Sequence, residues 1–183
     1  MTTDKLKGYT EDLYTLLKHT QNVVRKQKNS DKLSHSKAVN LLHQIDISLS
    51  NQINHIESNE DWHEDDLKSS IKEKLGSLTG KIAGYIDSAR EDAESKMLRD
   101  DYTALSFIAT GYTMLHTAAL AADEAELASF SNDSLTTIAG LITETSRIIP
   151  HVVAEEIGSP QIAEKAEENT QRSWKPENMM EEA

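Results

Sequence analysis

Histidine and carboxylate side chains at helical spacing are the first residues in this sequence that could do chemistry. His43 and Asp46 are three residues apart. A helix would place both on one face, where they could contact the same cation. Asp12 and Glu144 are the carboxylates that other helices could add. The candidate metal ligands are therefore Asp12, His43, Asp46 and Glu144.

These residues also have a structural explanation. A di-metal helical bundle needs Glu-x-x-His twice, with further glutamates on the facing helices. The one literal match, Glu60-Asp61-Trp62-His63, lies in an acidic connection and not on a helix face. His43 borders an apolar stripe, where a hydrogen-bonded histidine is more common than a metal ligand. We therefore expect no resident metal, no cofactor and no catalytic residues.

Composition and charge exclude several classes of function. Lys plus Arg is 19 and Asp plus Glu is 31, so the net charge is −12. This charge argues against nonspecific binding to nucleic acid or to an anionic membrane. The absence of cysteine excludes thiolate nucleophiles and cysteine-ligated metals. Neither a signal region near the N-terminus nor a run of 18 apolar residues occurs, so we expect a cytoplasmic protein.

Apolar periodicity predicts helices along most of the chain. The first 149 residues contain no proline, which favours long helices, and Pro150 should kink or restart the last one. Apolar residues at spacings of three and four predict helices over about residues 3–28, 31–57, 65–95, 99–124 and 134–157. The segments 29–31 and 129–134 are expected to be turns that cap the helices after them. Residues 1–158 are therefore predicted to form an all-α, antiparallel four-helix bundle with an additional helical segment.

Two features suggest association with another molecule. Gly76, Gly80 and Gly84 follow one line of the predicted 65–95 helix, which indicates close approach of another backbone, from the same chain or from a dimer partner. Residues 159–183 are polar and acidic, and we expect a tail that is mobile or ordered only against a partner. Trp174 is the single large apolar residue of this tail. The acidic charge would also suit a helical adaptor that binds a basic partner.

Two stretches are similar to a known family. They are DKLSHSKAVNLLHQIDISLSNQINHIES (31–58) and GYTMLHTAALAADEAELASFSNDSLTTIAGLITE (111–144). Together they resemble the bacterial stress-induced ferritin-like proteins of the YciE and YciF type, with helix order and connection lengths that fit across about residues 5–157. The resemblance implies a ferritin-like four-helix bundle, often dimeric, whose members are suspected of binding two metal ions between the long helices.

The chain departs from that family at the metal ligands. Thr110 stands where the family has a glutamate before its tyrosine, and Glu144 is the only acidic residue at the family's last acidic cluster. A di-iron centre needs several carboxylates to neutralise two cations. The leading hypothesis is therefore a non-enzymatic ferritin-like stress protein that acts through self-association, as a homodimer, or through a protein partner. The alternative is an iron- or manganese-binding oxidoreductase or metal-storage bundle with the unusual ligands named above.

Overall fold

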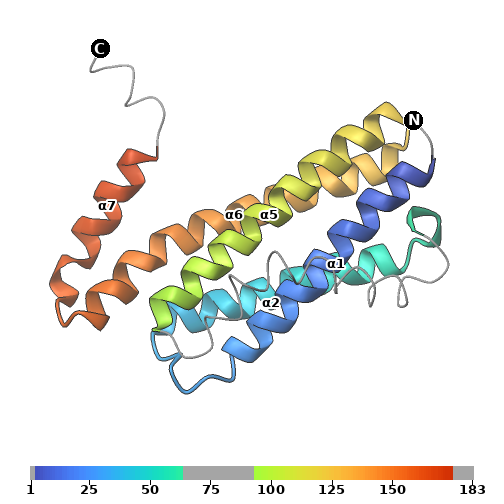
Figure 1. Cartoon of the computed structure of the whole chain (residues 1–183). Coiled ribbons are helices and arrows are strands. Elements are labelled where there is room, and N and C mark those ends of the chain that lie inside the picture. Colours follow the sequence, from blue (N-terminus) through green and yellow to red (C-terminus); the bar gives the residue numbers. More distant parts are fainter. Residues whose placement is uncertain (1–2, 64–92, 175–183) are drawn as a thin grey trace, which may run out of the picture.

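A computed structural model describes residues 3–63 and 93–174 of the chain. These residues form five α-helices and two short 3-10 helices, and no strand (Figure 1). The fold is therefore all-α, as the sequence predicts. The elements in chain order are α1 (Thr3–Gln27), α2 (Ser36–Glu57), η1 (Glu60–Trp62), α5 (Glu94–Ala121), α6 (Ala125–Glu156), η4 (Pro160–Ile162) and α7 (Ala163–Ser173).

Side-chain contacts show that α1 and α2 are antiparallel. Among the contacts that join them, three have residue numbers that rise on α1 while they fall on α2: Tyr14 to Glu57, Gln21 to Ser50 and Arg25 to Asp46. Helices α5 and α6 form a second antiparallel pair. Its contacts run from the backbone N–H of Ser95 to the carboxylate of Glu156, and from the His116 ring to the Ala128 carbonyl.

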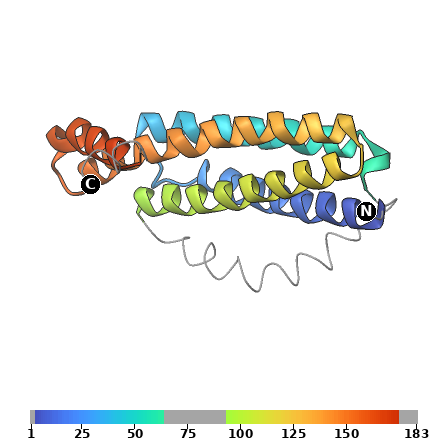
Figure 2. The same ribbon diagram turned by 90° about the horizontal axis from the view of Figure 1, so that it is seen from above.

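The two helical hairpins pack so that α2 and α5 run parallel. The hydroxyl of Ser34 contacts Glu94 and the amide of Gln52 contacts Tyr112, and both pairs are 60 residues apart. The end of η1 and the start of α5 therefore lie at opposite ends of the bundle (Figure 2). Helices α1, α2, α6 and α5 form a four-helix bundle, and α7, which lies in the predicted tail beyond residue 158, packs against α6.

Most residues of the predicted apolar stripes are buried on the four bundle helices, whereas Tyr9 of α1 and Val153 of α6, which were expected to point inward, are exposed. At Gly111 on α5, a Cβ atom would lie 3.0 Å from Cδ1 of Leu13, so glycine allows α1 and α5 to approach closely here. The core residues with no exposed surface include Leu17, Leu42, Ile45, Leu49, Leu105, Ile108, Tyr112, Leu115 and Ile138.

The turn predicted at residues 129–134 is wrong, because α6 already begins at Ala125. The chain reverses at Asp123, whose φ of 58° is a left-handed conformation that aspartate tolerates. The backbone N–H of Glu124 returns to the carbonyl of Ala119, which closes the helix end. Polar residues in the expected turn are accommodated inside the helix: the Ser131 hydroxyl, for example, donates to the Leu127 carbonyl.

Two other helix boundaries follow from specific contacts. Helix α2 begins at Ser36 and not near residue 31. The two backbone N–H groups just before it, those of Ser34 and His35, donate to the Glu94 carboxylate of α5. Helix α6 continues through Pro150 without a restart. It ends where predicted, at Gly158, whose φ of 70° favours glycine.

The described part of the predicted acidic tail is helical. Residues 160–173 form η4 and α7, and α7 packs against the last turns of α6. The predicted 65–95 helix lies almost wholly outside the described residues, as do Gly76, Gly80 and Gly84.

We expect the buried Tyr112 hydroxyl to stabilise the fold. It donates to the side-chain oxygen of Gln52 over 2.8 Å, at a site closed to solvent. Tyr112→Phe leaves that buried acceptor without its donor, so the free energy of unfolding should fall by about 1 to 2 kcal/mol. Urea denaturation measures this change. Tyr102→Phe is the control, since Tyr102 is only half-buried, and equal losses in the two variants would contradict the expectation.

Candidate functional site

The structure uses Asp46 as an ion-pairing residue between α1 and α2. Its carboxylate contacts Nε of Arg25 at 2.9 Å and Nζ of Lys28 at 2.8 Å. Burial alone would raise the pKa of Asp46, but hydrogen bonds and charge from Lys28 and Arg25 outweigh that effect and lower it. Two cations already neutralise this carboxylate, which explains its place on α2 without a metal.

The other predicted ligands do not gather around Asp46. His43 is exposed on α2, Asp12 is exposed on α1 and Glu144 is exposed on α6. Within residues 3–63 and 93–174, no group of three or more histidine and carboxylate side chains could hold a metal ion. The alternative of an iron or manganese centre therefore finds no ligand set in the described part of the chain.

The described interior of the bundle is mostly apolar, with buried hydroxyls such as those of Thr15, Ser131 and Thr145 bonded within their own helices, and one hydrogen bond joins side chains of α5 and α2 there. The Tyr112 hydroxyl and the Gln52 amide meet there, among leucine and isoleucine side chains from all four helices. Burial raises the pKa of Tyr112 above its ordinary value, so the phenol stays protonated and acts as a donor. This interior can stabilise a fold, but it offers no acid–base pair to a substrate.

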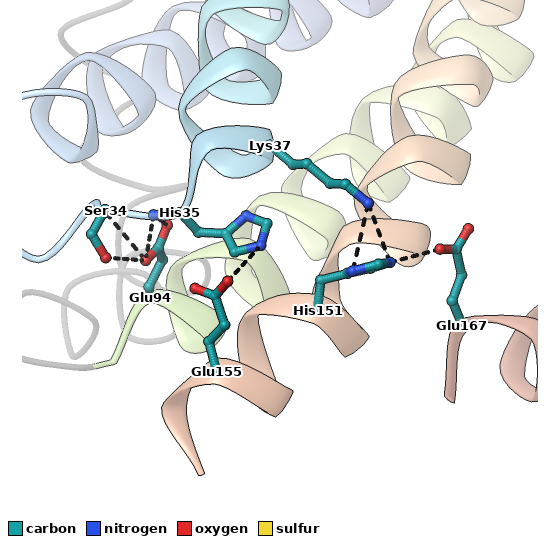
Figure 3. Close-up of polar contacts among 7 residues, drawn as sticks. All are labelled: Ser34, His35, Lys37, Glu94, His151, Glu155 and Glu167. Carbon is teal, nitrogen blue, oxygen red and sulfur yellow. Dashed lines mark hydrogen bonds and ion pairs between the residues drawn. The ribbon is translucent and has the colours of Figure 1, made fainter. Parts of the chain in front are cut away.

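A polar cluster at one end of the bundle joins four helices (Figure 3). Its first part is the carboxylate of Glu94, the first residue of α5. That carboxylate accepts hydrogen bonds from the backbone N–H groups of Ser34 and His35 and from the Ser34 hydroxyl, at 3.1 to 3.2 Å. The N-terminus of α2 is therefore capped by a residue 60 positions away in sequence.

The second part of the cluster connects α2 and α6 to α7. The His35 ring lies 3.6 Å from Glu155 of α6. His151 of α6 lies between Lys37, whose Nζ is 3.3 Å from Nε2, and Glu167 of α7, whose carboxylate is 2.7 Å from the same nitrogen. Figure 3 shows that the His151 side chain contacts both Lys37 of α2 and Glu167 of α7. We call these residues the end cluster: Ser34, His35, Lys37, Glu94, His151, Glu155 and Glu167.

The end cluster was not found by sequence reasoning. Its members are single polar residues near helix ends, and only the packed bundle brings them together. Their contacts satisfy helix ends and hold α7 in place, which is a structural role. The serine hydroxyl in the cluster, that of Ser34, donates to the Glu94 carboxylate, which also accepts the backbone N–H groups of Ser34 and His35, so this contact holds the backbone just before α2.

An open groove of about 470 Å³ lies between α2 and α6. It contains His55, Asp133 and Ser134, the three residue types of a hydrolase triad. The His55 ring stacks instead on Phe130, with centroids 4.6 Å apart, and makes no hydrogen bond to Asp133 or Ser134 in the described structure. The arrangement lacks the nucleophile–base contact that such a triad requires.

The outer face of α5 is uncharged and partly apolar. No Asp, Glu, Lys or Arg occurs between Asp101 and Asp123, and Phe107 and Met114 expose 50% and 47% of their surface. Among the described helices, α5 is the one long and apolar enough to cross a membrane by length and composition, with 39% of that window buried in the bundle. We call the exposed line Thr103, Phe107, Thr110, Met114 and Thr117 the α5 seam.

The absence of charge over residues 102–122 is the sequence signal that could have identified the α5 seam. Trp174, predicted as an interaction residue, follows α7 and is 64% exposed. Its ring meets the edge of the Tyr102 ring, with centroids 5.8 Å apart. One side of this tryptophan is therefore held by α5, and the other side faces solvent.

No family model, curated protein or solved structure matches this chain.

One buried carboxyl gives the fold a pH dependence. Asp101 on α5 is almost fully buried, and this burial raises its pKa to about 7; the charge of Asp100 adds to the shift and a hydrogen bond from Gln27 opposes it. The folded protein therefore keeps this proton up to about pH 7, whereas the unfolded chain releases it near pH 4. The resulting stability is fully present below pH 4 and is lost as the pH rises to 7.

We expect Asp101→Asn to abolish the loss of folding stability that the wild-type protein shows as the pH rises to 7. At pH 7.5 the variant should exceed the wild-type protein in free energy of unfolding by a few kcal/mol, on the order of 3 to 4. At pH 4.5 the two proteins should be nearly equal. Urea denaturation at both pH values measures the difference. Asp133→Asn, at an exposed position on α6, is the control. If the difference in free energy of unfolding between Asp101→Asn and the wild type were the same at both pH values, the expectation would be contradicted.

We expect His151 to hold α7 against α6. His151→Gln removes the ring that contacts both Lys37 and Glu167, so amide hydrogen exchange over residues 163–173 should become roughly tenfold faster, while residues 105–115 keep their protection. Hydrogen exchange with mass spectrometry measures both segments. Lys165→Gln, at an exposed position on α7, is the matched control. Unchanged exchange in α7 of the His151 variant would show that other contacts hold this helix.

Proposed function

We propose that this chain acts through association and not through catalysis, as a non-enzymatic, ferritin-like bundle of stress physiology in the cytoplasm. The observation that supports association is the α5 seam, an uncharged and partly apolar helix face on a protein with a net charge of −12. Apolar side chains exposed in a continuous line are typical of surfaces that bind another protein.

The ferritin-like assignment is supported by the order and direction of the helices. A ferritin-like bundle contains two antiparallel helix pairs joined by one long crossover that runs the length of the bundle. The pairs α1–α2 and α5–α6, with α2 parallel to α5, have this arrangement (Figure 2). The assignment to stress physiology rests on the resemblance of residues 31–58 and 111–144 to the YciE and YciF type.

The non-enzymatic part of the proposal is supported by the apolar interior. A di-metal ferritin-like centre would need carboxylates and histidines at mid-bundle, where this chain has Tyr112, Gln52 and aliphatic side chains. The buried carboxylates of α5 are Glu94, Asp100 and Asp101, all in its first two or three turns. They lie at one end of the bundle, away from its centre.

Light scattering coupled to size-exclusion chromatography tests the association. We expect the wild-type protein to be a dimer at about 100 µM and Phe107→Glu to weaken it at least tenfold, because a charge enters the contact surface. Ile47→Glu is the matched control: Ile47 is similarly exposed, but it lies on α2, diagonally across the bundle.

Two results would contradict the proposed function. The first is a wild-type protein that stays monomeric at this concentration and binds no partner through α5. The second is stoichiometric iron or manganese in protein purified without a histidine tag, which would favour the metal-binding alternative.

A further inference from the structure

The threonines of the α5 seam are less polar than their residue type suggests. The hydroxyls of Thr103, Thr110 and Thr117 each donate to the backbone carbonyl four residues earlier, at 3.0, 3.0 and 2.8 Å. Their hydrogen-bonding capacity is thus used within the helix, and the methyl group remains for outward contacts. Thr103, Phe107, Thr110, Met114 and Thr117 follow one another at spacings of four and three, the heptad spacing of helices that pair lengthwise.

The charge of the molecule favours a second copy as the occupant of this seam. A basic partner would be attracted to the acidic faces of the protein, and the α5 seam has no charge to offer it. Two copies of a protein with a net charge of −12 repel each other over most of their surface. They can approach where that surface is neutral, and each copy supplies a neutral seam of the same length and composition.

The positions of the two large side chains fix the geometry. Phe107 and Met114 are seven residues apart, about 10 Å along the helix, and lie symmetrically about Thr110 and Gly111. A two-fold axis at this point brings Phe107 of one copy onto the partner's Met114, and the reverse contact forms at the same time. Methionine sulfur packs favourably on an aromatic ring, so the antiparallel pairing satisfies both side chains.

We infer that two copies of this chain pair antiparallel along the α5 seams, about a two-fold axis next to Thr110. The inference rests on the proposed function and names the partner and the contact surface. It implies that the bundles lie side by side, with the end clusters at opposite ends of the dimer.

Cysteine cross-linking tests the position of the axis, because the natural sequence has no cysteine. In Thr110→Cys the two thiols lie close together at the axis, so mild oxidation should convert most of the protein into a disulfide-linked dimer. Thr143→Cys is the matched control. Thr143 is exposed on α6, and its hydroxyl makes the same contact, to the Ala139 carbonyl at 2.9 Å. This variant should stay unlinked.

Charge exchange tests the direction of pairing. Phe107→Lys and Met114→Glu should each weaken the dimer at least tenfold, because each buries an unpaired charge. The double variant should recover most of this loss in an antiparallel dimer, since the lysine of one copy meets the glutamate of the other. In a parallel dimer, like charges would meet and the double variant would be weaker than either single one. Circular dichroism confirms that each variant remains helical.

The outcomes separate the inference from the proposed function. A wild-type dimer whose Thr110→Cys form does not cross-link, and which tolerates Phe107→Glu, would overturn the two-fold α5 contact and leave association through another face. A protein that is monomeric at about 100 µM would overturn both. Cross-linking at Thr110 with recovery in the double variant would support both.

Discussion

The carboxylate of Glu94 is the contact on which the arrangement of this bundle depends. It accepts the backbone N–H groups that precede α2, and it does so from the first residue of α5. The free amides of a helix N-terminus must find acceptors, and a carboxylate there also interacts favourably with the helix dipole. This contact places the start of α5 beside the start of α2, so these two diagonal helices run parallel and each of the four neighbouring pairs of the bundle is antiparallel.

The ion pairs and the charged hydrogen-bonding groups described above lie at the ends and on the outer surface of the bundle, while its middle is mostly apolar. The end cluster connects α2, α5, α6 and α7 through carboxylates and two histidines. The mid-bundle position that a metalloprotein would use holds Tyr112 and Gln52, bonded to each other.

The sequence predicted the fold class and most of the buried stripes, because the spacing of Leu105, Ile108 and Tyr112 on α5 follows directly from helix geometry. It misplaced the start of α6, since the serines and Asn132 of 129–134 are common in turns but also fit within a helix when their hydroxyls bond the preceding turn. The left-handed residue that makes the actual turn, Asp123, gives a weaker signal than glycine would. The sequence-based prediction also started the second helix near residue 31, whereas α2 begins at Ser36.

The candidate site was predicted less well, and for a physical reason. Local spacing correctly put His43 and Asp46 on one helix, but it could not show that Arg25 and Lys28 occupy the Asp46 carboxylate. The end cluster contains residues as far apart in sequence as Ser34 and Glu167, so no local pattern contains it. The α5 seam was visible in the sequence as an absence of charge, a signal that inspection for chemical groups overlooks.

The single connection between the two hairpins has a consequence for how the chain folds. Contacts within α1–α2 and within α5–α6 are local, so each hairpin can form early without closing a long loop. Their docking is a separate event, and its entropic cost grows only slowly with the length of the 29 residues between His63 and Ala93. A hairpin that docks onto the complementary hairpin of another chain would make the same contacts, which is the geometry of a domain-swapped dimer.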